Sequence, residues 1–214
     1  VELAREPLWL HSCKLLRPFV DEVFLVGSIP GFEPPASIRL LTDSPPGFGP
    51  LGGIATGLEQ SGYTHHLLVA VDYPLIRPDL LTGLLAHSDS HWAVCTRSAA
   101  FLEPLVAYYR ADCAPVARQM LAAGEVRTHR LFERVPSFVM DDRELAKIDP
   151  PKWSHFNVNT PSDLLEAEAR LGPFAARQAG LVARPDEEES FDYARAPEHE
   201  ALASAPQRQI ELRG

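Results

Sequence analysis

Two aspartates that follow apolar segments are the residues with the clearest chemical potential. Asp43 follows the short apolar run 38–42, and Asp72 follows the stronger run 66–71. Both runs are typical of buried strands, and in an open α/β sheet ligands bind at the edge where such strands end. A carboxylate there can provide one of the few protein oxygens that Mg²⁺ uses. We expect Asp72 to hold a metal ion and Asp43 to contact a base or ribose, or to share the metal. The alternative for each is a capping role for loop amides.

A glycine-rich segment, 47–58, connects the two apolar runs. It has Pro50 near the start of a predicted helix, and Gly52 and Gly53 lie in the first turn of that helix. Glycine allows close approach of the backbone to a ligand, and the free N–H groups of a helix N-terminus attract anions. We expect Gly52 and Gly53 to line a nucleotide pocket. The alternative is a merely flexible loop, since one glycine-rich run is a weak motif, but the flanking aspartates favour a site.

Two asparagines precede the last predicted helix. Asn157 and Asn159 alternate along 156–159, which we predict to be a short strand, so both side chains would share one face and could hold a ligand through amide hydrogen bonds. Turn formation before Pro161 is an equally good explanation of these residue types. The final helix is expected over 160–171, with Pro161 at its first position.

Composition limits the classes of function. The chain has 214 residues, 45% of them hydrophobic, and a formal net charge of −9, which argues against nucleic-acid or anionic-membrane binding. The 3 cysteines are far apart and outside any CxxC pattern, so neither a disulfide framework nor a zinc site is indicated. The sequence has no apolar run of membrane-spanning length and no secretory start. We therefore expect a cytoplasmic protein.

The elements that must position these residues alternate between helix and strand. Helices are predicted over 7–18, 50–62, 112–123 and 160–171, with another ending near 87; strands or extended segments are predicted over 23–26, 38–41, 66–71, 92–96, 102–109, 135–140 and 156–159. This alternation predicts a Rossmann-like, doubly wound, mostly parallel α/β sheet. After about residue 172 branched apolar residues become rare and an acidic run appears at 186–189. We predict a domain at 1–172 and a disordered acidic tail at 173–214.

Five motifs occur in the order of a known family. They are Thr42-Asp43, Gly49-Pro50-Leu51-Gly52-Gly53-Ile54 with Gly57-Leu58, Val71-Asp72-Tyr73-Pro74, Glu103-Pro104-Leu105 with Tyr108, and Phe156-Asn157-Val158-Asn159-Thr160-Pro161-Ser162-Asp163-Leu164. Over residues 7–171 the sequence resembles molybdenum cofactor guanylyltransferases of the MobA type. The resemblance implies a nucleotidyltransferase that moves GMP from GTP·Mg²⁺ to molybdopterin and releases pyrophosphate. It also implies partners among molybdoenzymes or other proteins of the cofactor pathway.

The resemblance also implies roles for individual residues. Asp43 would contact the guanine nucleotide, and Gly52 and Gly53 would line its pocket. Asp72 would be the catalytic residue that binds Mg²⁺. Asn157 and Asn159 would face the pterin acceptor.

The sequence departs from the family at its start. The family opens with a strand, a Leu-Ala-Gly-Gly-x-Ser-x-Arg-Met-Gly loop and a lysine, which hold the triphosphate and base, whereas this sequence begins at Val1 beyond that segment. Because phosphoryl transfer depends on positioning and charge neutralisation, loss of the loop should remove most catalysis. Either the segment lies upstream, or the protein is a relative that binds without catalysing.

Other functions remain open from the sequence. A cytidylyltransferase of the same pathway or a sugar-phosphate nucleotidyltransferase shares the aspartate and asparagine motifs, and a non-catalytic binding or regulatory module would fit the absent loop. The first strand of such a sheet is central. We therefore expect the strands at 23–26 and 66–71 not to pair directly, and another segment, such as the acidic tail, to fill the slot between them.

Overall fold

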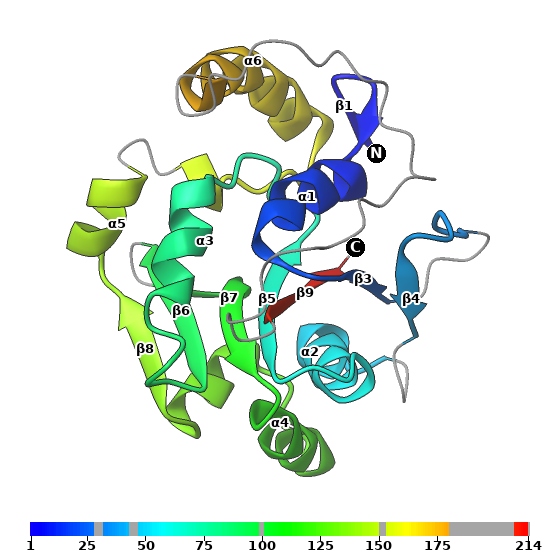
Figure 1. The fold of residues 1–214 in the computed structure, drawn as a ribbon, viewed down its shortest axis with the longest axis vertical. Helices are drawn as coiled ribbons and strands as arrows, with labels where there is room; N and C mark the ends of the chain where they lie inside the picture. The colour runs from blue at the N-terminus through cyan, green and yellow to red at the C-terminus, as the bar shows by residue number, and fades with distance from the viewer. Residues whose placement is uncertain (28–31, 43–46, 99–100, 150–152, 180–207, 214) are drawn as a thin grey trace, which may run out of the picture.

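A mixed sheet with helices on both faces forms the body of the protein (Figure 1). The computed structural model describes residues 1–27, 32–42, 47–98, 101–149, 153–179 and 208–213. In this part of the chain seven strands form one sheet in the order β4-β3-β9-β5-β7-β6-β8. They are β3 (Val23–Val26), β4 (Arg39–Leu41), β5 (His65–Ala70), β6 (Ala93–Ser98), β7 (Phe101–Arg110), β8 (Ser137–Met140) and β9 (Arg208–Arg213). A separate two-stranded ribbon consists of β1 (Glu2–Leu3) and β2 (Glu6–Pro7).

The sheet is mostly parallel, as predicted. Of the seven strands, β7 alone runs opposite to the rest, since it pairs antiparallel with β5 and β6 while the other pairs are parallel. The reversal follows from the short connection between β6 and β7, because so few residues can join only antiparallel neighbours. The carboxyl ends of β3, β4, β5, β6 and β8 therefore meet at one edge of the sheet, which we call the carboxyl edge.

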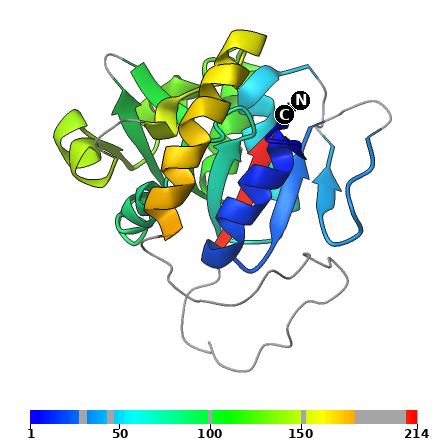
Figure 2. The same ribbon diagram turned by 90° about the horizontal axis from the view of Figure 1, so that it is seen from above.

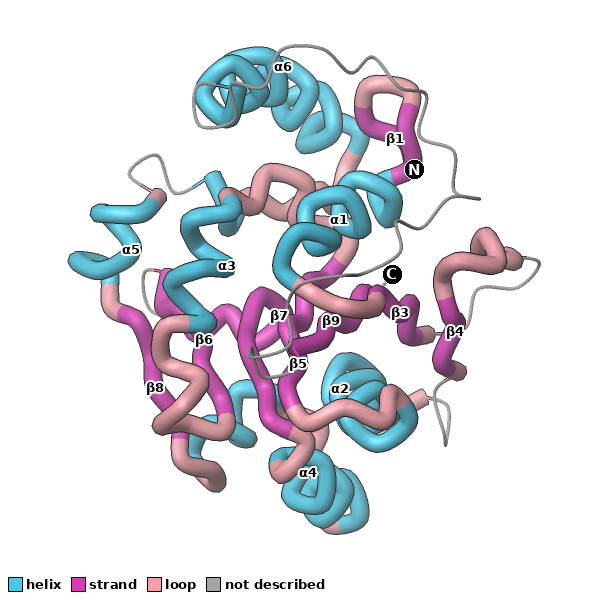
Figure 3. Tube along the Cα trace, in the orientation of Figure 1, coloured by secondary structure: helices cyan, strands magenta, loops and turns pink. Residues whose placement is uncertain are grey.

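Helices cover the two faces of the sheet (Figures 1 and 3). They are α1 (Leu8–Leu16), α2 (Gly49–Gln60), α3 (Pro78–Leu85), α4 (Cys113–Ala122), α5 (Asp142–Ile148) and α6 (Pro161–Ala179), with short 3₁₀ helices η1 (Arg17–Phe19), η2 (Thr128–Glu133) and η3 (Trp153–His155). Helices α1, α3 and α5 lie on one face, and α2 and α4 lie on the other. None of the helices in the described residues has the length and apolarity needed to cross a membrane.

The core consists of two apolar layers separated by the sheet. Along β5, Leu67 and Val69 belong to the layer under α1 and α3, whereas Leu68 belongs to the layer over α2 and α4. On β7, Tyr108 and Tyr109 divide in the same way, and both are fully buried. This alternation is what the period-2 geometry of a strand requires when both faces are covered.

Strand β9 lies between β3 and β5. It pairs in parallel with Val23–Val26 on one side and with His65–Ala70 on the other. The expectation that another segment separates these two strands is therefore confirmed. The backbone N–H and C=O groups of such a strand find partners on both sides, and this pairing does not require apolar side chains. The low hydrophobicity from which we predicted a disordered tail therefore does not prevent residues 208–213 from forming a strand.

The predicted disordered tail at 173–214 needs correction at both ends. Helix α6 continues past residue 172 to Ala179, and residues 208–213 form β9. Residues 180–207 lie outside the described residues, so the domain boundary itself stays a prediction. Figure 2, viewed from above, shows α6 alongside α1. A small apolar cluster of Leu3, Leu8, Val158 and Ala167 joins α6 to the N-terminal ribbon.

Candidate functional site

Asp72 lies at the carboxyl edge just after β5, where it was predicted. The last five residues of β5 are buried, and the chain then turns, with the Tyr73 N–H donating to the Ala70 carbonyl at 3.3 Å. The Asp72 carbonyl accepts a hydrogen bond from the Val158 N–H at 2.8 Å, which ties the loop before α6 to this turn. Burial raises the pKa of Asp72, and hydrogen bonds from Asn157 and from its own backbone N–H partly oppose this.

Asn157 lies close to Asp72. Its side chain lowers the pKa of Asp72 and that of Tyr73, against the larger effect of burial. Asp72 Oδ1 and Asn157 Oδ1 are both buried and have no hydrogen-bond partner among the described residues. Buried oxygens without partners are rare in folded proteins and need an explanation, such as an ion or water. Carboxylate and amide oxygens of this kind are ligands that a hard cation accepts.

The loop that carries Asn157 is held in place by η3. Ser154 Oγ accepts from the Arg77 N–H at 3.0 Å, and the Ser154 N–H donates to Asp149 Oδ2 at 2.8 Å. Thr96 Oγ1 lies 2.6 Å from His155 Nε2. The end of β6, the start of α3 and the end of α5 thus all hold η3, and this fixes the path of the chain into residues 156–159.

Asn159 lies in different surroundings from Asn157. Residues 156–159 form a loop, so the predicted strand is wrong, and the Asn159 side chain is exposed. The N–H groups of Asn159 and Thr160 donate to Asp163 Oδ2 at 3.0 and 2.8 Å, and the Asp163 N–H donates to Thr160 Oγ1 at 3.2 Å. This reciprocal arrangement caps α6 and takes the place of strand pairing. The Asn159 backbone thus takes part in the turn before α6, and the acceptor role of its side chain stays a prediction.

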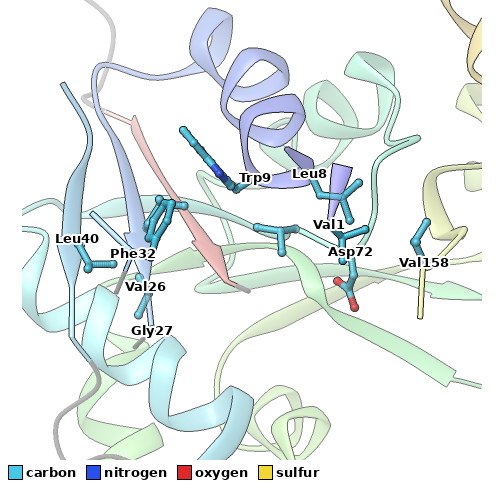
Figure 4. Close-up of a pocket in the computed structure, with 11 residues that line it drawn as sticks. Val1, Leu8, Trp9, Val26, Gly27, Phe32, Leu40, Asp72 and Val158 are labelled. Carbon is cyan, nitrogen blue, oxygen red and sulfur yellow. The ribbon is translucent and has the colours of Figure 1, made fainter. Parts of the chain in front are cut away.

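A pocket of about 300 Å³ lies beside Asp72, between α1 and the sheet (Figure 4). Its lining is apolar except for Asp72: Val1, Leu8, Trp9, Leu25, Val26, Gly27, Phe32, Leu40, Val71, Asp72 and Val158. The rings of Trp9 and Phe32 meet edge to face with centroids 5.7 Å apart. Figure 4 shows Asp72 at the opposite end of the pocket from Phe32 and Leu40. Such a pocket suits a flat, largely apolar group whose polar or charged part reaches Asp72.

The predicted nucleotide-binding residues lie elsewhere or outside the described part of the chain. Gly52 and Gly53 are buried in the first turn of α2, which packs on the face opposite α1, and neither lines the pocket. A Cβ on Gly52 would lie 2.8 Å from Phe48 Cβ, so the close approach of Phe48 already requires glycine there. Asp43 lies outside the described residues. The nucleotide roles of these three residues stay predictions.

Tyr73 and Glu103 belong to the site, although the sequence suggested no role for them. Tyr73 Oη donates to Glu103 Oε2 at 3.2 Å. Burial raises the pKa of both side chains, and the charge of Glu103 raises that of Tyr73 further. The available signal was their place in the motifs at 71–74 and 103–105, where a polar side chain interrupts an apolar segment.

An open, mostly parallel α/β sheet with polar side chains gathered at its carboxyl edge defines the class of doubly wound proteins that bind small ligands at that edge. Residues 1–138 match the MobA-like NTP transferase domain, and the chain belongs to this family of nucleotidyltransferases.

Individual relatives agree with this assignment. A probable molybdenum cofactor guanylyltransferase of Chloroflexus aggregans is 35% identical over 166 residues, which cover 76% of this chain and 79% of the relative. A protein with the same description from Pelotomaculum thermopropionicum is 28% identical over 167 residues, covering 78% of this chain and 82% of the relative.

Two solved structures share the fold. Molybdopterin-guanine dinucleotide biosynthesis protein A of Archaeoglobus fulgidus has a TM-score of 0.67 at 24% identity, covering 81% of this chain and 89% of that one. The 2-C-methyl-D-erythritol 4-phosphate cytidylyltransferase of Thermus thermophilus has a TM-score of 0.61 at 17% identity, covering 80% and 92%. At these identities the likeness concerns the fold alone.

Proposed function

We propose that this protein transfers GMP from GTP to molybdopterin, with release of pyrophosphate, in molybdenum cofactor biosynthesis. The observation that carries the proposal is the pair of unpartnered oxygens on Asp72 and Asn157 at the carboxyl edge, in a chain of the NTP transferase family whose relatives are described as guanylyltransferases. The two side chains lie 85 positions apart in the sequence, so the fold must bring them to the same edge of the sheet.

The donor set fits Mg²⁺. This ion takes one or two protein oxygens and completes its shell with water and substrate phosphates. The described residues contain no group of three or more His, Cys, Asp or Glu side chains that could hold a metal, whereas a carboxylate beside an amide oxygen is present. When bound, Mg²⁺ would supply charge neutralisation at the triphosphate.

The side chains of the site have separate tasks in this proposal. Asp72 and Asn157 hold the ion and thereby the triphosphate, and the apolar pocket under α1 excludes water from a flat ring. Asp43, Gly52 and Gly53 contact the nucleotide, and the exposed Asn159 side chain faces the acceptor.

In the reaction a phosphate oxygen of molybdopterin attacks the α-phosphorus of GTP. A new P–O bond forms as the bond to the bridging oxygen breaks, and pyrophosphate leaves with the electron pair. Most of the catalysis expected for such a step comes from positioning and electrostatics. Asn157 was predicted to face the acceptor; we assign it to the ion because its Oδ1, like that of Asp72, is buried without a hydrogen-bond partner among the described residues.

Pyrophosphate release by the full chain with GTP, molybdopterin and Mg²⁺ tests the proposal. Asp72→Asn should lower turnover by on the order of 100-fold or more, while its melting temperature changes little. The matched control is Asp89→Asn, which alters an exposed aspartate after α3 and should retain full activity. Full activity of Asp72→Asn would remove Asp72 from the site.

Tighter binding of CTP than GTP would favour the cytidylyltransferase, and GTP binding without turnover would favour the non-catalytic module.

A further inference from the structure

Asp149 is a fully buried carboxylate that has no part in the site described above. It follows α5 directly, and 0% of its surface is exposed. Its Oδ2 accepts a hydrogen bond from the Ser154 N–H at 2.8 Å, whereas its Oδ1 is buried and has no hydrogen-bond partner among the described residues. Burying a carboxylate costs free energy, and an apolar side chain could fill the same space at a lower cost. The bond to Ser154 therefore explains why a carboxylate occupies this position.

Ser154 connects Asp149 to the segment that carries Asp72. Ser154 is also 0% exposed, and its Oγ accepts a hydrogen bond from the Arg77 N–H at 3.0 Å. Further along the same loop, the Val158 N–H donates to the Asp72 carbonyl at 2.8 Å. The segments 72–77 and 154–158 are thus bonded to each other at both ends, in antiparallel order.

Asn157 lies between these two connections, one residue before Val158. Its Oδ1 is buried and without a partner in the described part of the chain, as is Asp72 Oδ1. The connection at Val158 uses backbone atoms alone, so it does not depend on the type of side chain there. The connection at Ser154 depends on the Ser154 hydroxyl and on the Asp149 carboxylate. These two side chains therefore determine how the segment with Asn157 lies against the segment with Asp72.

We propose that Asp149 is a positioning residue that, through Ser154, keeps Asn157 beside a divalent-cation site. The cation is the one that Asp72 would hold for the triphosphate, so this proposal rests on the proposed function. Asp149 and Ser154 do not touch the cation themselves. They act as outer partners that fix a ligand of the metal, and the loss of such partners weakens metal binding in other proteins.

General stabilisation of α5 is the competing explanation. Asp149 ends this helix, and its N–H donates to the Leu145 carbonyl at 2.8 Å. The matched control is Asp141, whose side chain caps the other end of α5 by accepting from two N–H groups of that helix. Asp141→Ala should therefore destabilise α5 without changing the connection between Asp149 and Ser154.

The test variants remove the connection in steps. Asp149→Ala leaves the buried Ser154 N–H without an acceptor, whereas Asp149→Asn keeps an acceptor oxygen for it. Ser154→Ala removes one hydroxyl, which is the acceptor for the Arg77 N–H, and leaves the Ser154 backbone in place. Because this is the smallest change in volume, Ser154→Ala decides the question if Asp149→Ala does not fold.

The experiment is titration of the full chain with Mn²⁺ alone, with free Mn²⁺ measured by electron paramagnetic resonance. Asp149→Ala and Ser154→Ala should each weaken Mn²⁺ binding by roughly 10-fold or more. Asp149→Asn should recover most of the affinity, and Asp141→Ala should bind Mn²⁺ like the wild type. In turnover, Ser154→Ala should raise the Mg²⁺ concentration needed for half-maximal rate, and excess Mg²⁺ should restore the rate.

The outcomes separate the two proposals. If Asp72→Asn abolishes Mn²⁺ binding while Asp149→Ala and Ser154→Ala bind like the wild type, the positioning role is wrong and the cation site stands. If Asp72→Asn leaves Mn²⁺ binding unchanged, or the wild-type chain binds none, the cation site itself fails and both proposals fall. Equal weakening by Asp141→Ala would show that a loosened α5 is the cause, and the positioning role would again be wrong.

Discussion

Protonation of His66 is expected to make the stability of this protein depend on pH. The side chain lies on β5 with only 2% of its surface exposed, and Ser61 Oγ lies 2.6 Å from its Nε2. Burial, the largest influence, lowers the pKa of His66 from 6.5 to about 4. At pH 7 the ring is neutral in both the folded and the unfolded chain, so the shift has no effect there.

The sign of the effect follows from proton binding. As the pH falls below 6.5 the unfolded chain takes up a proton at His66, and the folded chain does so only near pH 4. Stability is therefore present above pH 6.5 and is lost as the pH falls towards 4. The pKa difference corresponds to about 3 kcal/mol when the loss is complete, and to about 2 kcal/mol at pH 5. This is a large share of the roughly 5 to 15 kcal/mol typical of a domain.

Urea unfolding at pH 7 and pH 5 measures this loss. The wild-type chain should lose about 2 kcal/mol more unfolding free energy between these two pH values than His66→Gln, which cannot titrate. Any destabilisation of His66→Gln at pH 7 cancels, because only the change with pH is compared. The matched control is His129→Gln, at an exposed histidine of η2, which should follow the wild type. If His66→Gln and wild type lose the same free energy between pH 7 and pH 5, burial of His66 does not control its protonation.

Four further predictions concern the scaffold. Gly52→Ala should lower unfolding free energy by about 1 to 3 kcal/mol, because the new Cβ would meet Phe48 Cβ at 2.8 Å; unchanged urea unfolding would contradict this. Asp141→Ala should lower the melting temperature and Asp141→Asn should not, since the Asp141 side chain accepts from two N–H groups at the start of α5. Removing residues 208–214 should lower the melting temperature, because β3 and β5 would lose their shared neighbour; an unaltered melt would argue against β9. Burial raises the pKa of each of the three thiols to about 12, so iodoacetamide at pH 8 should react only on unfolding with Cys13, Cys95 and Cys113.

Local patterns were enough to predict most elements and one site residue. The strands before and after the glycine-rich segment were recognisable as continuous apolar runs, which a sheet buried on both faces requires. The position of Asp72 followed directly, because a polar residue that ends a buried strand must lie at the edge of the sheet. The start of α6 was equally local, since Pro161 and the Thr160–Asp163 pair form its first turn. Helix α5 was missed because its seven residues are too few to show a periodic pattern.

Contacts between distant parts of the chain depended on the tertiary structure alone. Asn157 meets Asp72 across 85 positions of sequence because η3 and the Val158–Asp72 hydrogen bond bring the two loops together, and no local periodicity encodes that approach. The Tyr73–Glu103 hydrogen bond likewise depends on the pairing of β5 with β7. The placement of β9 depends on backbone partners offered by two strands, which composition does not report. Residue types and spacing thus determined which side chains reach the carboxyl edge, and the fold decided which of them touch, because contact there is set by long-range packing and hydrogen bonding.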